Sequence, residues 1–149
     1  GFNVDHLVIA EQGIYVIETK TYSKPAGRKA CIGFDGQTLL MDGQPFISDP
    51  TAQACAAAAW IRRLIRELTG RDFRPRAVVA FPGWFIEPEA QKRAMASKNP
   101  AWILEPKALP HWIARREAVI KQSDVRLISF NLSQAIRKAG SGHIVSEAI

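Results

Sequence analysis

Two apolar runs joined by a short turn near the start of the chain constrain its fold most. Residues 4–10 and 14–17 are rich in β-branched side chains, and residues 11–13 (Glu-Gln-Gly) are typical of a turn. The runs are therefore predicted to form a β-hairpin, with Gly13 free to adopt a positive φ. Because both faces are apolar near the turn, we expect the hairpin to be buried on both sides.

The register of this hairpin decides which polar side chains share a face. Side chains alternate along a strand, and directly paired residues lie on the same face. If Ile9 pairs with Ile14, the residue opposite Asp5 is Glu18, at the end away from the turn. Lys20 then lies on the same face. A slip of one residue would separate the two carboxylates, so we predict the first register.

Two carboxylates and a lysine on one patch of sheet can support hydrolysis of a phosphodiester. Asp5 and Glu18 repel each other when they are directly opposed, and a divalent cation relieves that repulsion. Mg²⁺ and Mn²⁺ suit carboxylate, carbonyl and water ligands. Lys20 can stabilise the transition state or orient the attacking water. The alternative from residue types alone is a surface ion pair between Lys20 and one carboxylate.

The Glu-x-Lys triplet at residues 18–20 is not specific by itself. Such a triplet is expected about once by chance in a chain of this size, and a second copy stands at residues 105–107. That copy has no hairpin-paired aspartate before it, and Pro106 interrupts any strand. The first copy is more specific, because it occurs together with the turn, the apolar strands and Asp5.

Residues 4–9 (VDHLVI) and 13–20 (GIYVIETK) closely resemble the nuclease-related domain family, NERD, which is placed within the PD-(D/E)XK nuclease superfamily. Residues 49–53 (DPTAQ) are similar to the family's (N/D)P-x-x-Q step into a helix, and residues 77–83 are similar to a later strand. The similarity covers roughly residues 1–85 in order. It implies an α/β fold with a restriction-endonuclease-like core, a mixed β-sheet flanked by helices.

The resemblance also implies roles for individual residues. Asp5 and Glu18 would bind Mg²⁺ or Mn²⁺, helped by the backbone carbonyl of Thr19, and Lys20 would be the catalytic lysine. Gln53 would be an accessory active-site residue in the first turn of a helix. The family usually has an upstream helix with a Gly-Glu pair and a further strand, so we expect this chain to lack its N-terminal helix and first strand.

The charge balance favours a polyanionic partner. Lys and Arg number 20 against 14 Asp and Glu, which gives a net charge of +6. Two groups are candidates for phosphate contact, one in the loop after the hairpin and one on a long helix: Lys24, Arg28 and Lys29, and Arg62, Arg63 and Arg66. A solvated helix face is the alternative for the second group.

The remaining elements follow from local signals. A second hairpin is expected over residues 30–34 and 38–41, with Asp-Gly at its turn. A helix over residues 51–68 should begin after Asp49 and Pro50 and end at Gly70. A strand over residues 76–81 should pair in parallel within the sheet. Further helices are expected over residues 109–121 and 132–139. The tryptophans are expected to lie in the core.

Composition sets the class of protein. An apolar content of 47% over 149 residues supports one folded domain, expected over residues 1–139 with a flexible tail over 140–149. No run of 18 apolar residues occurs, so no membrane association is expected. Cys31 and Cys55 fit no metal-binding spacing and are expected to be free thiols in the cytoplasm.

The predicted function is metal-dependent hydrolysis of DNA phosphodiesters, in DNA processing or repair. DNA is the expected partner, and fusion to or association with other DNA-processing domains is left open, as is the oligomeric state. A catalytically silent module on a nuclease fold, binding nucleic acid or another partner, is the main alternative. A regulatory or scaffold domain without a nucleic-acid role is the third.

Overall fold

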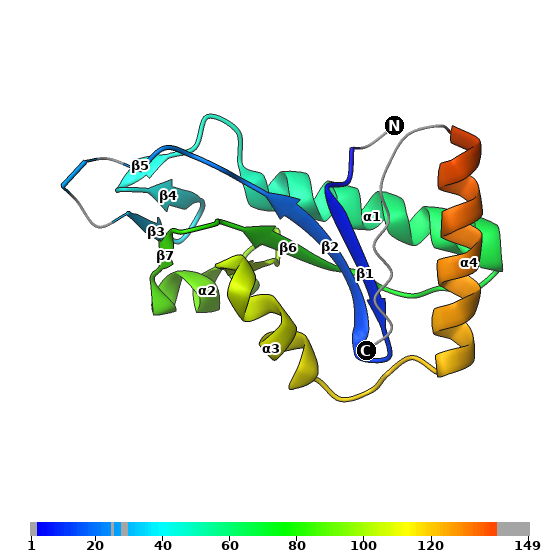
Figure 1. Cartoon of the computed structure of the whole chain (residues 1–149). Helices are drawn as coiled ribbons and strands as arrows, with labels where there is room; N and C mark the ends of the chain where they lie inside the picture. Colours follow the sequence, from blue (N-terminus) through cyan, green and yellow to red (C-terminus); the bar gives the residue numbers. More distant parts are fainter. Residues whose placement is uncertain (1–2, 25, 28–29, 140–149) are drawn as a thin grey trace.

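The computed structural model describes residues 3–24, 26–27 and 30–139, which form two four-stranded sheets with helices around them (Figure 1). The first sheet contains, in order, β1 (His6–Ala10), β2 (Gly13–Thr19), β6 (Arg76–Ala80) and β8 (Trp102–Leu104). The second contains β5 (Gln44–Pro45), β4 (Leu39–Met41), β3 (Cys31–Phe34) and β7 (Phe85–Ile86). The predicted α/β class with mixed sheets flanked by helices is confirmed, with the strands divided between two sheets.

The first hairpin has the predicted register. β1 and β2 are antiparallel, with Ile9 opposite Ile14. Gly13 at the turn has φ 140°, a conformation that glycine adopts without strain. Alternate residues of the hairpin enter two separate hydrophobic clusters, one on each face of the sheet. Both faces of the hairpin are therefore buried near the turn, as predicted.

The long helix α1 (Pro50–Thr69) covers one face of the first sheet. Asp49 caps its N-terminus, because its Oδ1 accepts hydrogen bonds from the N–H and the hydroxyl of Thr51 at 2.9 and 2.7 Å. Gly70 ends the helix with φ 70°. The helix buries small and branched side chains against the sheet: Ala54, Ala57, Ala58, Ile61 and Ile65. The helix predicted for residues 51–68 is confirmed.

The connection from β2 through α1 to β6 creates a parallel pair. Tyr15 lies opposite Arg76, and Thr19 lies opposite Ala80. β8 adds in parallel on the other side of β6. The carboxyl ends of β2, β6 and β8 therefore meet at one edge, which is also the end away from the hairpin turn. The predicted parallel pairing is confirmed.

The C-terminal helices differ from the prediction. Helix α3 (Leu109–Ala114) stops well before residue 121, because Val119 and Ile120 donate backbone N–H groups to the carbonyl of Glu11 at 2.8 and 3.0 Å. This contact holds the segment against the hairpin turn in a non-helical form. Helix α4 (Gln122–Ala139) begins well before residue 132 and packs against α1 (Figure 1).

Several smaller predictions can also be compared with the structure. The second hairpin is confirmed as β3 and β4, whereas helix α2 (Pro88–Met95) was not predicted. Trp84 and Trp102 are buried, and Cys31 and Cys55 are free. Within the described ranges, no helix is long and apolar enough to cross a membrane. The predicted tail over residues 140–149 lies outside the described residues.

Removing the cap of α1 tests how the helix is held. We expect Asp49→Ala to lower the free energy of unfolding by about 0.5–2 kcal/mol, because two hydrogen bonds at the helix start are lost. Urea denaturation measures the change. Glu87→Ala is the matched control, since Glu87 precedes α2 without a side-chain cap bond. Equal effects of the two substitutions would contradict this account of Asp49.

Candidate active site

The end of the hairpin away from its turn gathers the predicted catalytic side chains. The ladder between β1 and β2 ends at the pair His6 and Ile17. Asp5 lies in the bend just before β1, and continuing the register by one residue brings it to the end of β2 beside Glu18. Lys20 follows two residues after Glu18 and lies on the same face as Glu18.

Lys20 connects the end of β2 to helix α1. Its Nζ lies 3.1 Å from Oε1 of Glu18 and donates a hydrogen bond of 2.8 Å to Oε1 of Gln53. The side chains of Lys20 and Glu18 are 22% and 19% exposed, so the pair is partly shielded and still reachable from solvent. Gln53, in the first turn of α1, therefore lies at the Glu18 end of the strand, where the sequence predicted it.

The orientation of the Gln53 amide is set by a second contact. Its Nε2 donates a hydrogen bond of 2.6 Å to the hydroxyl of Ser48, just before the helix cap. This contact directs the amide oxygen towards Lys20. Sequence reasoning missed Ser48, whose only signal was its position directly before Asp49.

Asp5 has a structural contact as well as a place in the site. Its Oδ2 accepts a hydrogen bond of 2.9 Å from the backbone N–H of Thr19. Thr19 lies beyond the end of the β1–β2 ladder, so this carboxylate replaces a strand partner. The N–H and C=O of one strand residue point to the same edge. The Thr19 carbonyl is therefore directed towards the side on which Asp5 lies.

The donor set at this end suits a hard divalent cation. Asp5, Glu18 and the Thr19 carbonyl offer oxygen atoms, which Mg²⁺ and Mn²⁺ prefer. Among the described residues, no group of three or more His, Cys, Asp or Glu side chains forms a metal site. A cation here would complete its shell with water or substrate oxygens, as Mg²⁺ commonly does. The residues therefore fit Mg²⁺ better than Zn²⁺.

The second Glu-x-Lys copy has a different structure. Glu105 caps the short 3-10 helix Pro106–Ala108, and its Oε2 accepts a hydrogen bond from the backbone N–H of Lys107 at 2.9 Å. Its carboxylate is thus used in a local helix cap. This copy provides an internal control with the same residue types in another setting.

The predicted phosphate-contacting residues do not form one group. Lys24 lies in the exposed loop after Lys20, against Gly83, while Arg28 and Lys29 lie outside the described residues. Arg62 donates to both oxygens of Asp72 at 2.8 and 2.6 Å. Asp72 therefore neutralises part of the charge that the sequence suggested for phosphate binding.

The arginines of α1 lie away from the Glu18 end of the sheet. Helices rise about 1.5 Å per residue, which places Arg62 about 13 Å beyond Gln53 along the axis. Arg63 is exposed one residue further on, and Arg66 binds Asp72 at 2.9 Å. The structure thus brings Asp5, Glu18, Lys20 and Gln53 together but leaves these arginines apart from them.

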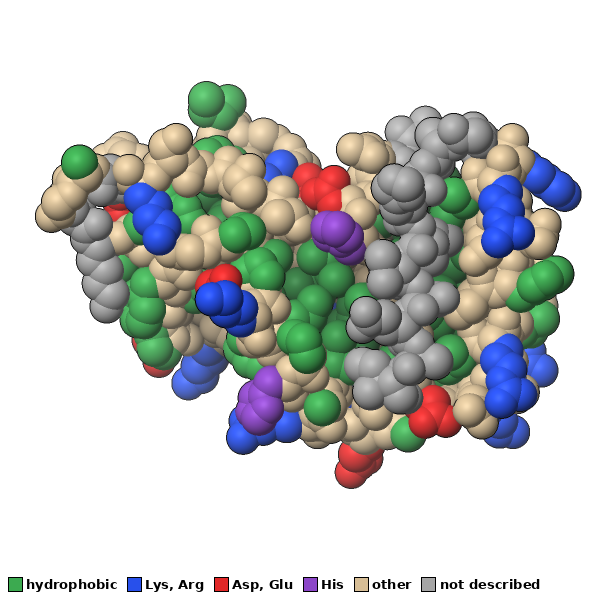
Figure 2. Space-filling model, in the orientation of Figure 1, with side chains coloured by type: hydrophobic (Ala, Val, Ile, Leu, Met, Phe, Trp, Pro, Cys, Tyr) green, Lys and Arg blue, Asp and Glu red, His purple; other side chains and the backbone are tan. Residues whose placement is uncertain are grey.

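An apolar hollow of about 430 Å³ lies on the other face of the sheet, beside Thr19. Figure 2 shows apolar side chains exposed in the middle of this face. Its lining comes from the hairpin and from the region of α3, and includes His6, Ile17, Thr19, Leu109 and Ile113. The candidate site is therefore bordered on one side by polar side chains and on the other by apolar surface.

The contact of Asp5 with Thr19 makes the choice of substitution matter. We expect Asp5→Ala to lower the free energy of unfolding by about 1–3 kcal/mol, because the Thr19 N–H loses its acceptor. Asp5→Asn should lose less, since its amide oxygen can still accept. Urea denaturation of both variants measures this difference, and stabilities equal to the unsubstituted protein in both cases would contradict the structural role.

The ion pairs of Asp72 predict its behaviour in acid. Hydrogen bonds from Arg62, and then from Arg66, hold the pKa of the Asp72 carboxyl far below its usual range. Because the folded pKa is lowered, the ionised Asp72 carboxyl stabilises the fold fully at pH values above its unfolded pKa of about 3.9. This stabilisation is lost as the pH falls through the lower folded pKa. Carboxyl NMR should show Asp72 still ionised at about pH 3. Titration near the ordinary value would show that the pairs do not persist in solution.

A comparison with models of protein families gave a match in the N-terminal part of the chain. A family model described as nuclease-related domain, NERD, matches residues 1–82, more than half of the 149 residues. The matched range contains β1, β2, α1 and β6, and with them the four side chains gathered at the candidate site. Neither the comparison with curated proteins nor that with solved structures gave a match.

Proposed function

The chain belongs to the nuclease-related domain family, and we propose that it hydrolyses phosphodiester bonds in DNA with the help of a divalent metal ion. The observation that carries this proposal is the position of the Lys20 ammonium. It contacts Glu18 and Gln53 at the open end of the hairpin, where Asp5 accepts a hydrogen bond from the backbone of Thr19. This combination of a lysine and two carboxylates suits attack by water on a phosphodiester.

The chemistry of Lys20 follows from its contacts. An ammonium group has three N–H donors, and those towards Glu18 and Gln53 account for two of them. The third can donate to a phosphate oxygen or to the attacking water. Water then adds to phosphorus as a P–O ester bond breaks, which leaves a phosphate monoester and a hydroxyl. Lys20 stabilises the negative charge that develops on the phosphate oxygens.

The other residues position the reacting groups. Asp5, Glu18 and the Thr19 carbonyl would hold Mg²⁺ or Mn²⁺, and the bound ion would supply positive charge at the phosphate. Gln53 fixes the lysine, because its amide is itself held by Ser48. The hydrogen bond from Thr19 to Asp5 keeps that carboxylate at the strand end.

A second candidate is a binding module on the same fold that lacks catalytic activity. It is favoured by the small number of acidic ligands, since among the described residues no group of three or more His, Cys, Asp or Glu side chains could hold a metal ion. Calorimetric titration with Mn²⁺ separates the two candidates. The nuclease proposal requires Mn²⁺ binding that is weakened in Glu18→Gln, whereas the silent module requires no such binding.

Nicking of supercoiled plasmid tests the proposed activity. With Mg²⁺ or Mn²⁺ present, we expect nicking that EDTA abolishes. Asp5→Asn, Glu18→Gln and Lys20→Ala should each lower the rate by at least about a hundredfold, because the first two remove a carboxylate that would hold the metal ion and the third removes the ammonium that acts at the phosphate. Asp5→Asn is preferred to Asp5→Ala because it keeps an acceptor for the Thr19 N–H.

The second Glu-x-Lys copy provides matched controls for this assay. Glu105→Gln and Lys107→Ala change the same residue types in a copy whose carboxylate caps a 3-10 helix, and they should leave the nicking rate unchanged. Full activity in Lys20→Ala, or equal losses in the control variants, would contradict the proposed site. Circular dichroism on every variant confirms that the fold is intact.

A further inference from the structure

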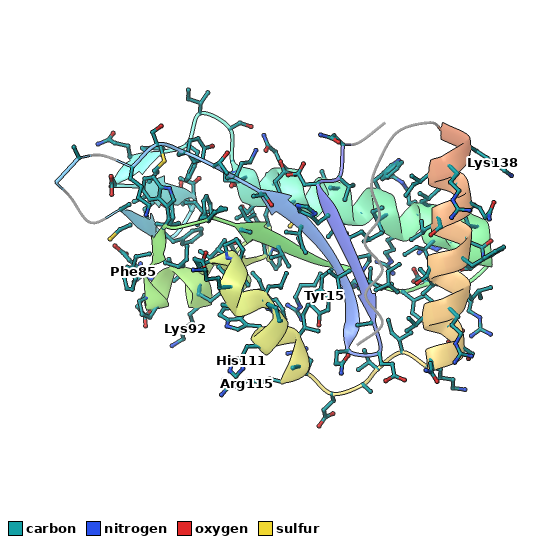
Figure 3. All side chains as sticks on the ribbon, viewed as in Figure 1. Tyr15, Phe85, Lys92, His111, Arg115 and Lys138 are labelled. Carbon is teal, nitrogen blue, oxygen red and sulfur yellow. The ribbon has the colours of Figure 1, made fainter. Side chains whose placement is uncertain are left out.

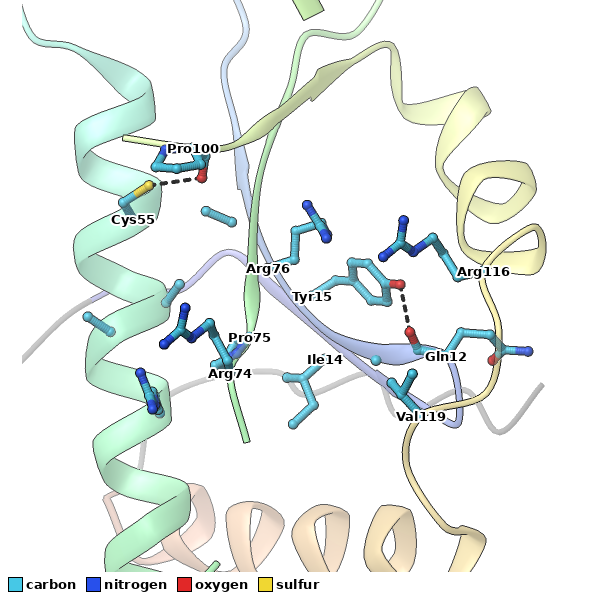
Figure 4. A pocket seen from close by; sticks show the side chains of 15 residues that line it. Gln12, Ile14, Tyr15, Cys55, Arg74, Pro75, Arg76, Pro100, Arg116 and Val119 are labelled. Carbon is cyan, nitrogen blue, oxygen red and sulfur yellow. Dashed lines mark hydrogen bonds between the residues drawn. The ribbon is translucent and has the colours of Figure 1, made fainter. Parts of the chain in front are cut away.

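An arginine-lined pocket of about 460 Å³ lies at the hairpin-turn end of the first sheet, opposite the candidate active site (Figure 4). Its walls come from the hairpin turn, α1, the start of β6 and the segment after α3. Four arginines line it, namely Arg62, Arg74, Arg76 and Arg116, and its described lining contains no acidic side chain. The pocket is therefore strongly positive.

Among the described residues, three of these arginines have no acidic partner. Arg62 is neutralised by Asp72, but within the described ranges no carboxylate forms an ion pair with Arg74, Arg76 or Arg116. The Arg76 guanidinium lies 4.8 Å from the centre of the Trp102 ring, which holds it in place without neutralising it. The positive charges of the pocket thus remain available to a ligand.

The arginines are arranged around a rigid aromatic wall. Figure 4 shows Arg76 and Arg116 on either side of Tyr15, with Arg74 towards α1. The Tyr15 ring stacks on Trp102 with centroids 5.2 Å apart, and its hydroxyl donates to the Gln12 carbonyl at 3.0 Å. Arg76 is therefore fixed, and the more exposed Arg74 and Arg116 can close on a ligand.

The electrostatics of the wall favour a bound anion. Burial lowers the pKa of Arg76, and the nearby charge of Arg116 lowers it further. Burial raises the pKa of Tyr15, so the phenol stays neutral and does not balance these charges. An anion bound near Arg76 and Arg116 would offset the repulsion between their guanidinium groups.

We propose that this pocket binds a phosphate group, carried either by a small phosphorylated molecule or by a nucleic-acid strand. Guanidinium groups pair with phosphate in a two-pronged geometry, and several of them suit an anion with more than one charge. The volume lies within the range of small-ligand pockets, about 300–1,000 Å³. The site is separate from the Glu18 end and does not depend on the proposed nuclease activity.

A calorimetric titration with inorganic phosphate tests the proposal. EDTA is present throughout, and chloride holds the ionic strength constant. We expect saturable binding that is about tenfold or more weaker in Arg74→Ala and in Arg116→Ala, because each removes charged hydrogen bonds. Both side chains are exposed, so both variants should keep the fold.

Arg115→Ala is the matched control. Arg115 is exposed next to Arg116 but does not line the pocket, and Figure 3 shows it projecting away from Tyr15 at the end of α3. Phosphate binding should be unchanged in this variant. Absence of saturable binding in the unsubstituted protein, or an equal loss in Arg115→Ala, would overturn the proposal.

Competition distinguishes the two sources of the phosphate group. A short single-stranded oligonucleotide is added to the phosphate-bound protein, again with EDTA. Displacement that is retained in Arg115→Ala would assign the pocket to a nucleic-acid strand. No displacement, with phosphate binding intact, would assign it to a small phosphorylated molecule. Loss of plasmid nicking would affect neither result, so the failure of one proposal is distinguishable from the failure of the other.

Discussion

The antiparallel register between β1 and β2 is the constraint on which the rest of the structure depends. Leu7, Ile9 and Val16 are buried on one face of the hairpin beneath α1, so a slip of one residue would expose them. Continued by one residue, the same register brings Asp5 to the end of β2 beside Glu18, where Asp5 accepts a hydrogen bond from the Thr19 N–H. Burial of apolar side chains therefore holds the two carboxylates together against their mutual repulsion, and Lys20 offsets part of that repulsion.

The site is completed by an element far away in the sequence. Helix α1 begins beside the carboxyl end of β2, and its Asp49 cap fixes the first turn from which Gln53 reaches Lys20. The return of the chain through β6 then places the arginine pocket at the opposite end of the same sheet. The two ends of the first sheet therefore carry two charged sites. The site at the Glu18 end contains acidic side chains, whereas the described lining of the arginine pocket contains none.

Local signals predicted the hairpin and α1, because β-branched runs, a turn glycine and a capped helix start act within a few residues of each other. The ends of α3 and α4 could not be predicted this way, since contacts of Val119 and Ile120 with Glu11 decide them. The pairing of Arg62 with Asp72 likewise depends on how the loop after α1 folds back. The position of Gln53 was anticipated through family resemblance, because the helix propensities alone do not show which way its side chain points.

The central claim is that the hairpin end holds a divalent cation between Asp5 and Glu18. Paramagnetic broadening of backbone amide NMR signals by Mn²⁺ tests it most directly, because broadening falls steeply with distance from the ion. We expect selective broadening at Asp5, Glu18 and Thr19, while signals of the hairpin turn around Gln12 and Gly13, at the other end of β2, stay sharp and Glu18→Gln abolishes the effect. Broadening centred elsewhere, or none at this strand end, would contradict it.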